Sequence, residues 1–278
     1  MTSRPLTFRH RPKLAGAALA AAVLLVAVLL AAAGNARAAI KTEAVTYKEG
    51  QAEAHSFIVY DDALGGKRPG VLVVPEWWGL NDYPMMRAKM LAQLGYVAMA
   101  VDIYGDGKTT DDPKQAGAWA EALETGGRAE LRTRIAAALA RLKSYPRVDP
   151  QRTAAIGYCF GGATVLELAR SGAEVNGVVT FHGHYDTNSP AKPGEIKARI
   201  LACQWRRLPF QSPAQIQAFE DEMRKARADW QFNIYSGAKH SFTNPNAGRH
   251  GIPALAYNAE ADHRSWQAMK DFFREIFR

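Results

Sequence analysis

The sequence predicts an α/β protein built on one open, mostly parallel sheet with helices on both faces. Short, continuous apolar runs alternate along the chain with amphipathic segments. Continuous apolar runs are typical of strands buried on both faces, and strands that alternate with helices are typical of parallel sheets. The composition is that of a globular protein, since 47% of the 278 residues are hydrophobic and 22% are charged.

The apolar runs are predicted strands, and the segments between them are predicted helices. The strands cover residues 70–75, 96–101, 153–157, 177–182, 198–203 and 230–235. The helices cover residues 81–94, 116–123, 127–145, 163–170, 213–227 and 259–277. Leu131, Ile135, Leu139 and Leu142 form an apolar stripe on the helix over 127–145, and Gly95 ends the first helix.

Residues 1–38 are a predicted signal peptide. Basic residues up to Lys13 precede an apolar run over 14–33, and residues 36–38 read Ala-Arg-Ala, the small-x-small pattern of a cleavage site. We expect cleavage after Ala38, which leaves one domain over 39–278 in the periplasm or outside the cell. The alternative is an uncleaved membrane anchor, because the apolar run is about long enough to span a bilayer.

The net charge of +8 does not indicate a nucleic-acid partner. Five of the positive charges and no acidic residue lie within residues 1–38, which leaves +3 on the remaining 240 residues. That charge is too small and too scattered for nucleic-acid binding. We expect a monomer, with membrane contact only through an uncleaved signal segment.

The strongest local motif is Gly-Tyr-Cys-Phe-Gly-Gly over residues 157–162, between a predicted strand and a predicted helix. A strained strand–turn–helix of this kind presents a nucleophile and needs small neighbours. Cys159 is therefore the predicted nucleophile, with its thiolate favoured by the helix N-terminus and the N–H of Phe160 available to an oxyanion. The alternatives are a buried structural cysteine and a disulfide with Cys203, the other cysteine of this domain.

His240 is the predicted base, because it follows the last predicted strand. His182 and His184 stand at the end of the strand over 177–182, and we expect His182 to pack at the rim of the site. A His-x-His pair can bind metal, but no third ligand is evident in the sequence. We therefore expect no metal, and no cofactor motif is present.

Five motifs together resemble the dienelactone hydrolase family of the α/β-hydrolase superfamily. They are Pro-Glu-Trp-Trp-Gly-Leu-Asn over 75–81, Asp-Ile-Tyr-Gly over 102–105, the cysteine motif over 157–162, Phe-His-Gly over 181–183 and Lys-His-Ser-Phe-Thr over 239–243. The resemblance runs over nearly the whole of residues 39–278. It implies an α/β-hydrolase fold, a Cys–His–Asp triad with Cys159 and His240, and hydrolysis of a small-molecule ester or lactone through an acyl-cysteine.

The resemblance also assigns roles to residues near the strand over 70–75. Glu76 contacts the resting thiol and helps to activate it, and the N–H of Trp77 is the second oxyanion donor. From the same motifs we expect Trp78 and Tyr104 to contact the substrate together with His182. The alternative for Glu76 is a buried, hydrogen-bonded structural acid.

The acid of the triad departs from the family pattern. The family has a stretch like His-Gly-Ala-Asp-Asp-Pro here, but residues 204–209 read Gln-Trp-Arg-Arg-Leu-Pro, so Arg207 stands where the acid belongs. Arginine cannot accept the imidazole N–H. The enzyme would then work as a dyad, use Asp186 as a substitute acid, or be a catalytically impaired or ligand-binding member of the family.

The same stretch fits a short compensated frameshift. Codons CAT GGC GCC GAC encode His-Gly-Ala-Asp, and one extra A or G after CA gives CAR TGG CGC CGA, which encodes Gln-Trp-Arg-Arg. These four residues match 204–207, and the family pattern resumes at Pro209. We therefore hypothesise a frameshift in the gene or in its sequencing.

The substrate's anion site also departs from the family. Dienelactone hydrolase holds a carboxylate with two arginines, and those places hold Asp106 and Asn244 here. Lys108 or Arg206 could compensate. An uncharged ester or lactone is therefore the expected substrate.

Overall fold

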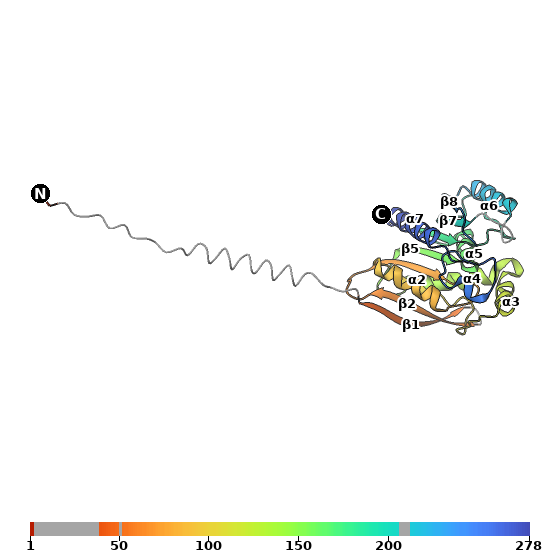
Figure 1. Cartoon of the computed structure of the whole chain (residues 1–278), viewed down its shortest axis with the longest axis horizontal. Helices are drawn as coiled ribbons and strands as arrows, with labels where there is room; N and C mark the ends of the chain where they lie inside the picture. Colours follow the sequence, from red (N-terminus) through yellow and green to blue (C-terminus); the bar gives the residue numbers. More distant parts are fainter. Residues whose placement is uncertain (3–38, 50–51, 206–211) are drawn as a thin grey trace. The chain divides into compact units, whose positions relative to one another are not determined.

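Figure 1 shows a computed structural model of the chain, in which an eight-stranded sheet lies between helices. The structure describes residues 1–2, 39–49, 52–205 and 212–278. The predicted signal peptide, apart from its first two residues, and Arg206 and Arg207 lie outside the described residues. Residues Ile40–Arg278 form a compact unit.

The sheet is open and mostly parallel, as predicted. Its strands are β1 (Ile40–Glu49), β2 (Ala52–Asp61), β3 (Arg68–Val74), β4 (Val97–Ala100), β5 (Val148–Tyr158), β6 (Gly177–Phe181), β7 (Arg199–Trp205) and β8 (Trp230–Tyr235). They are ordered β1-β2-β4-β3-β5-β6-β7-β8. β2 pairs with β1 and β4 in antiparallel fashion, and every other pair is parallel.

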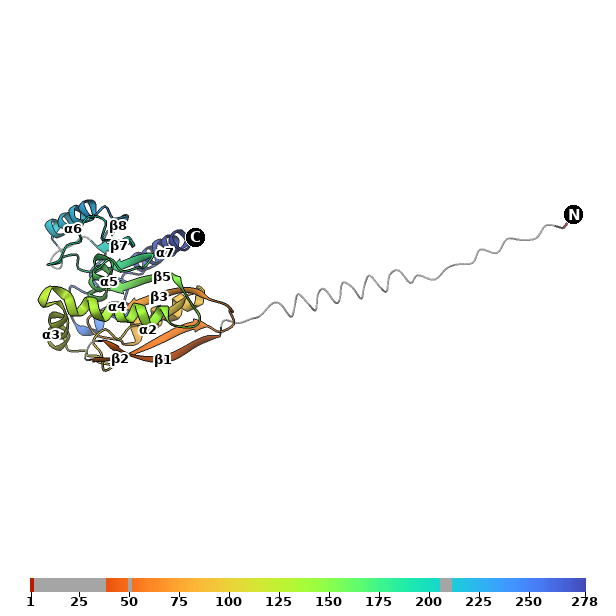
Figure 2. The same ribbon diagram turned by 180° about the vertical axis from the view of Figure 1, so that it is seen from behind.

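Helices cover both faces of the sheet, which confirms the predicted layers. They are α2 (Asp82–Gln93), α3 (Pro113–Glu124), α4 (Ala129–Lys143), α5 (Phe160–Arg170), α6 (Pro213–Ala226) and α7 (Ala259–Ile276), with short 3-10 helices η1 (Gly126–Arg128) and η2 (Ala247–His250). α2 and α7 bury Leu91 and Phe273 against one face. α4, α5 and α6 bury Ile135, Leu166 and Phe219 against the other, and Figure 2 shows α4 lying across the strands.

The predicted helix over 127–145 begins later than expected. Gly127 and Arg128 adopt φ of 73° and 62°, so α4 starts only at Ala129. Left-handed residues cannot continue a right-handed helix, and this conformation is visible only in the folded backbone. In the described part of the chain, no helix combines the length and apolar character needed to cross a membrane.

The parallel strands end at one edge of the sheet, and this edge carries the candidate site. Glu76 follows β3, Cys159 follows β5 and His182 follows β6. His240 follows β8 at the same edge. Ligands of open α/β sheets bind outside the carboxyl ends of the strands, so the fold brings residues far apart in sequence to one place.

Candidate active site

Cys159 stands on a strained turn between β5 and α5. Its φ of 54° and ψ of −115° lie in a region that residues with a side chain rarely adopt. The neighbouring glycines make the turn feasible. A Cβ on Gly157 would overlap the carbonyl oxygen of Gly161, and a Cβ on Gly161 would lie 2.5 Å from the carbonyl oxygen of Pro75. The turn therefore requires both glycines and fixes the thiol above the sheet.

His240 faces this thiol directly. Its Nε2 lies 2.9 Å from the Sγ of Cys159, and the two residues are only 3% and 6% exposed. The indole of Trp205, at the end of β7, packs edge-on against the imidazole with ring centroids 4.7 Å apart. A nucleophile and a base within hydrogen-bond reach are the arrangement that covalent catalysis needs.

The surroundings of this pair favour the uncharged form of both members. Burial, aided by the charge of Glu76, raises the pKa of the Cys159 thiol, and the backbone N–H groups of Phe160 and Trp77 only partly oppose this. Burial also holds the pKa of His240 well below its usual range. The helix N-terminus favours the thiolate as the sequence suggests, but desolvation outweighs it.

Two backbone donors converge on the sulfur. The N–H groups of Phe160 and Trp77 both act on the Cys159 thiol as hydrogen-bond donors. The Tyr104 hydroxyl donates to the carbonyl oxygen of Trp77 at 3.0 Å, and its ring stacks on Phe160 with centroids 5.6 Å apart. Tyr104 thus holds the two donors in place, and such a pair can accept a developing oxyanion.

Glu76 is a buried carboxyl beside the thiol. It is 3% exposed, and Asn244 Nδ2 donates to its Oε2 at 2.7 Å. Burial raises the pKa of Glu76, opposed by the side chains of Ser241 and Asn244 and by the charge of Arg87. A carboxyl with a raised pKa binds a proton more readily than an exposed carboxyl does. Asn244, which stands where the family has an anion-binding arginine, thus holds Glu76.

His182 supports the turn from within the core, whereas the sequence suggested a place at the rim. It is fully buried, and its Nδ1 accepts from the backbone N–H of Cys159 at 3.1 Å. Its Nε2 lies 2.7 Å from Thr243 Oγ1. Because Nδ1 accepts, the proton sits on Nε2. This placement does not support a direct substrate contact by His182.

Trp78 also lies deeper than a substrate-binding residue would. It is 2% exposed and stacks on His250, with ring centroids 3.7 Å apart. Its edge meets Trp77 at a centroid distance of 5.0 Å. Trp78 therefore packs the loop that carries the N–H of Trp77.

Asp186 is paired with another residue. Its carboxylate lies 3.2 Å from the guanidinium of Arg128. Within the described residues no hydrogen bond joins Asp186 to His240, so the structure does not support it as the substitute acid. Arg207, which stands where the family has its triad acid, lies outside the described residues.

His184 is a site residue that the sequence reasoning did not select. Its ring lies beside that of His240, with centroids 5.8 Å apart. Both cysteines are free, so the alternative of a disulfide between Cys159 and Cys203 is wrong for this structure.

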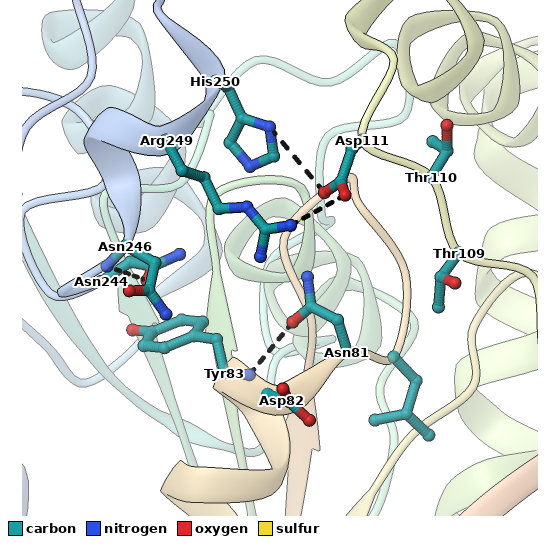
Figure 3. A pocket seen from close by; sticks show the side chains of 11 residues that line it. Asn81, Asp82, Tyr83, Thr109, Thr110, Asp111, Asn244, Asn246, Arg249 and His250 are labelled. Atoms are coloured by element: carbon teal, nitrogen blue, oxygen red, sulfur yellow. Dashed lines mark hydrogen bonds and ion pairs between the residues drawn. The ribbon is translucent and has the colours of Figure 1, made fainter.

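Asn244, which donates to Glu76, also lines a polar pocket of about 420 Å³ (Figure 3). Thr109, Thr110 and Asn246 contribute to its lining. Arg249 reaches across it to Asp111 at 2.8 Å, so its charge is paired. Lys108, a candidate to replace a missing arginine, is paired with Asp106 at 3.0 Å.

A cysteine on a strained strand–turn–helix, a histidine after the last strand and two converging N–H donors are typical of the α/β-hydrolase fold. The chain belongs to the dienelactone hydrolase family, whose model matches residues 55–277. A putative carboxymethylenebutenolidase of Synechocystis sp. is 26% identical over 250 residues, covering 84% of this chain and 97% of that protein.

Two solved structures are more similar in sequence. A structure named m3DLH is 44% identical and superposes with a TM-score of 0.82, covering 86% of this chain and all of the other. A dienelactone hydrolase-like promiscuous phosphotriesterase, P91, from metagenomic libraries is 41% identical with a TM-score of 0.80, covering 86% of this chain and 99% of the other.

Proposed function

We propose that the protein hydrolyses ester or lactone bonds of small molecules with Cys159 as nucleophile, through an acyl-cysteine intermediate. The observation that carries this proposal is the 2.9 Å contact between Cys159 Sγ and His240 Nε2 on the strained turn. The family, and the carboxymethylenebutenolidase-like relative, support a hydrolase.

The reaction follows from the resting state. As a carbonyl carbon approaches Sγ, His240 Nε2 takes the thiol proton and sulfur forms the new bond, with the oxyanion received by the N–H groups of Trp77 and Phe160. The intermediate collapses, and the leaving alkoxide takes the proton from His240. Water then attacks the acyl-cysteine, with His240 again as base, and the acid product and free thiol form. Glu76 assists through its negative charge beside the thiol, which favours the imidazolium that His240 becomes when it takes the thiol proton.

The substrate is best sought among uncharged esters and lactones. Asn244 is occupied by Glu76, and Lys108 and Arg249 are each paired with a carboxylate. A carboxylate on the substrate would therefore meet no free cation among these groups. Phosphotriesters are a second class to test, because of the likeness to P91.

We further propose that the protein is exported and that residues 1–38 are removed. The basic, apolar and small-x-small order of this segment supports export. N-terminal sequencing of protein recovered from a bacterial periplasm should begin at Ala39. A full-length product in the membrane pellet would identify the segment as an anchor.

The decisive experiment compares Cys159→Ser with Cys203→Ser. With a p-nitrophenyl ester, Cys159→Ser should lower kcat by about 100-fold or more, and Cys203→Ser should retain activity. Intact-mass analysis of the quenched reaction should show one acyl group on the wild type. Undiminished hydrolysis by Cys159→Ser would refute the nucleophile, and an inactive wild type that still binds esters would favour the ligand-binding alternative.

A further inference from the structure

The position of His184 beside Cys159 and His240 indicates a second role for the cysteine. Its ring has no hydrogen-bond partner among the described residues, although it lies in a largely buried place beside His240. One nitrogen of His184, one of His240 and the Sγ of Cys159 all lie within 4.8 Å of one another. A sulfur and two imidazoles thus face one point.

This ligand set suits a soft divalent metal ion. Thiolate and imidazole are the preferred ligands of Zn²⁺, which takes bonds of about 2.3 Å to sulfur and about 2.0–2.1 Å to nitrogen in a tetrahedron. Tetrahedral ligation would put Sγ about 3.6 Å from the histidine nitrogen. The observed distance of 2.9 Å must therefore widen by about 0.7 Å, a small movement for side chains on loops.

We propose that Cys159, His184 and His240 form a reversible site for a soft divalent metal ion of the Zn²⁺ type, and that metal bound there inhibits the enzyme. The thiol releases its proton to water as sulfur binds the metal, so the site gains one metal and loses one proton. Three protein ligands leave a fourth position for water. Inhibition follows because the metal occupies the lone pairs of both nucleophile and base. The sequence alone suggested no metal, since it did not reveal Cys159 as the third ligand.

His182 does not belong to this site, although it shares a His-x-His pair with His184. Its two nitrogens are engaged by the backbone N–H of Cys159 and by Thr243 Oγ1. The two histidines therefore have different roles: His182 supports the turn, and His184 lies beside the thiol.

Cobalt spectroscopy tests the site independently of hydrolysis. Purified protein without a polyhistidine tag, stripped with a chelator, is titrated with Co²⁺. A thiolate-to-cobalt charge-transfer band should saturate at one metal per chain and should be absent in Cys159→Ser. Zn²⁺ affinity is then measured by competition with a chromophoric chelator. His184→Ala should weaken it at least about tenfold, since even loss of a ligand's supporting partner typically costs that much. His263→Ala, at an exposed histidine, is the matched control and should bind as the wild type does.

The inhibition of ester hydrolysis by Zn²⁺ is measured for the wild type and for His184→Ala, each relative to its own activity without metal. Zn²⁺ should inhibit ester hydrolysis by the wild type at concentrations at least about tenfold lower than for His184→Ala, and a chelator should restore activity. The absence of a charge-transfer band in the wild type, or equal Zn²⁺ affinity in His184→Ala and wild type, would overturn the proposal. Should His184→Ala fail to fold, His184→Gln serves the same comparison. Because cobalt binding is read without substrate, an inactive hydrolase would not affect this outcome.

Discussion

The Nε2 of His240 and the Sγ of Cys159 lie 2.9 Å apart, and burial raises the pKa of the thiol and lowers that of the imidazole. A cysteine paired with a charged histidine is already a thiolate and reacts with any electrophile. Here burial and the charge of Glu76 favour the protonated thiol. Under the proposed mechanism we therefore expect the thiol to lose its proton when the substrate approaches, not before.

Alkylation of Cys159 should report this protonated thiol. Because burial raises the pKa of Cys159, the rate with iodoacetamide should keep rising with pH through pH 9, above the ordinary cysteine value of about 8.5. Cys203→Ser removes the other thiol, and mass spectrometry locates the label. A rate that levels off below pH 7 would mean a resting thiolate.

Replacement of Glu76 should separate the thiol's reactivity from catalysis. Glu76→Gln removes the charge that raises the pKa of Cys159, so alkylation at pH 8 should become faster. Hydrolysis should nevertheless fall at least about tenfold in kcat/KM, because the negative charge that favours the imidazolium of His240 is lost. Glu260→Gln, on the exposed start of α7, should change neither rate. If the role of Glu76 is purely structural, Glu76→Gln should instead lower the rates of alkylation and hydrolysis together and lower the melting temperature.

The pH dependence of hydrolysis should show the depressed pKa of His240. The imidazole acts as a base only when neutral, and burial lowers its pKa well below 6.5. Activity should therefore persist as the pH falls through 6.5 and be lost only when it falls through the lower pKa. A profile of kcat/KM from pH 4 to 9 measures this loss of activity at low pH. A midpoint at or above 6.5 would show that the histidine is not desolvated in solution.

Local features of the sequence predicted this site best. The turn that carries Cys159 depends on glycines within two residues, and β3 and β5 end in short apolar runs. Each of these signals spans only a few consecutive residues. β1 was missed because most of its residues are exposed, so no continuous apolar run marks it. β2 was missed although residues 57–60 form a short apolar run, which the prediction did not use.

Residues whose roles depend on distant partners could not be predicted. Asp186 is paired with Arg128, which lies 58 residues earlier in the chain. His182 and His184 are two residues apart, but β6 ends at Phe181 and the backbone turns at His182, with φ of 42°. Strand alternation therefore does not apply: His182 accepts from the backbone N–H of Cys159, whereas His184 lies near its Sγ.

A methyl group on Gly161 should disturb the turn. The Cβ of Gly161→Ala would meet the carbonyl oxygens of Val74 and Pro75, which belong to β3 and its end and cannot move freely. We expect a loss of about 1–3 kcal/mol, which corresponds to a melting temperature lower by several degrees. Gly65→Ala, whose Cβ would enter open space, is the matched control. Equal melting temperatures for the two variants would show that the end of β3 moves to accommodate the methyl group.

The last prediction concerns Arg207, which lies outside the described residues. The family resemblance places the acid partner of His240 at this position. A carboxylate there fixes the histidine tautomer and stabilises its charged form, and loss of the acid in a serine triad costs about 10⁴ in kcat. A thiol needs less help from its base than a hydroxyl, so the loss should be smaller here. We expect Arg207→Asp to raise kcat/KM by at least about tenfold, equivalent to about 1.4 kcal/mol of transition-state stabilisation. The sign follows because a positive charge disfavours the imidazolium and a negative charge favours it.

Resequencing of the gene separates the two origins of this arginine. A read with His-Gly-Ala-Asp over 204–207 would identify a sequencing error, whereas an in-frame arginine in expressed protein would establish a genuine substitution. Arg206→Asp, one residue away, is the matched control for a general change in charge and should raise kcat/KM by far less than Arg207→Asp. If Arg207→Asp leaves the rate unchanged while Asp186→Asn abolishes it, the acid has moved to Asp186. Its pairing with Arg128 at 3.2 Å would then have to break during turnover.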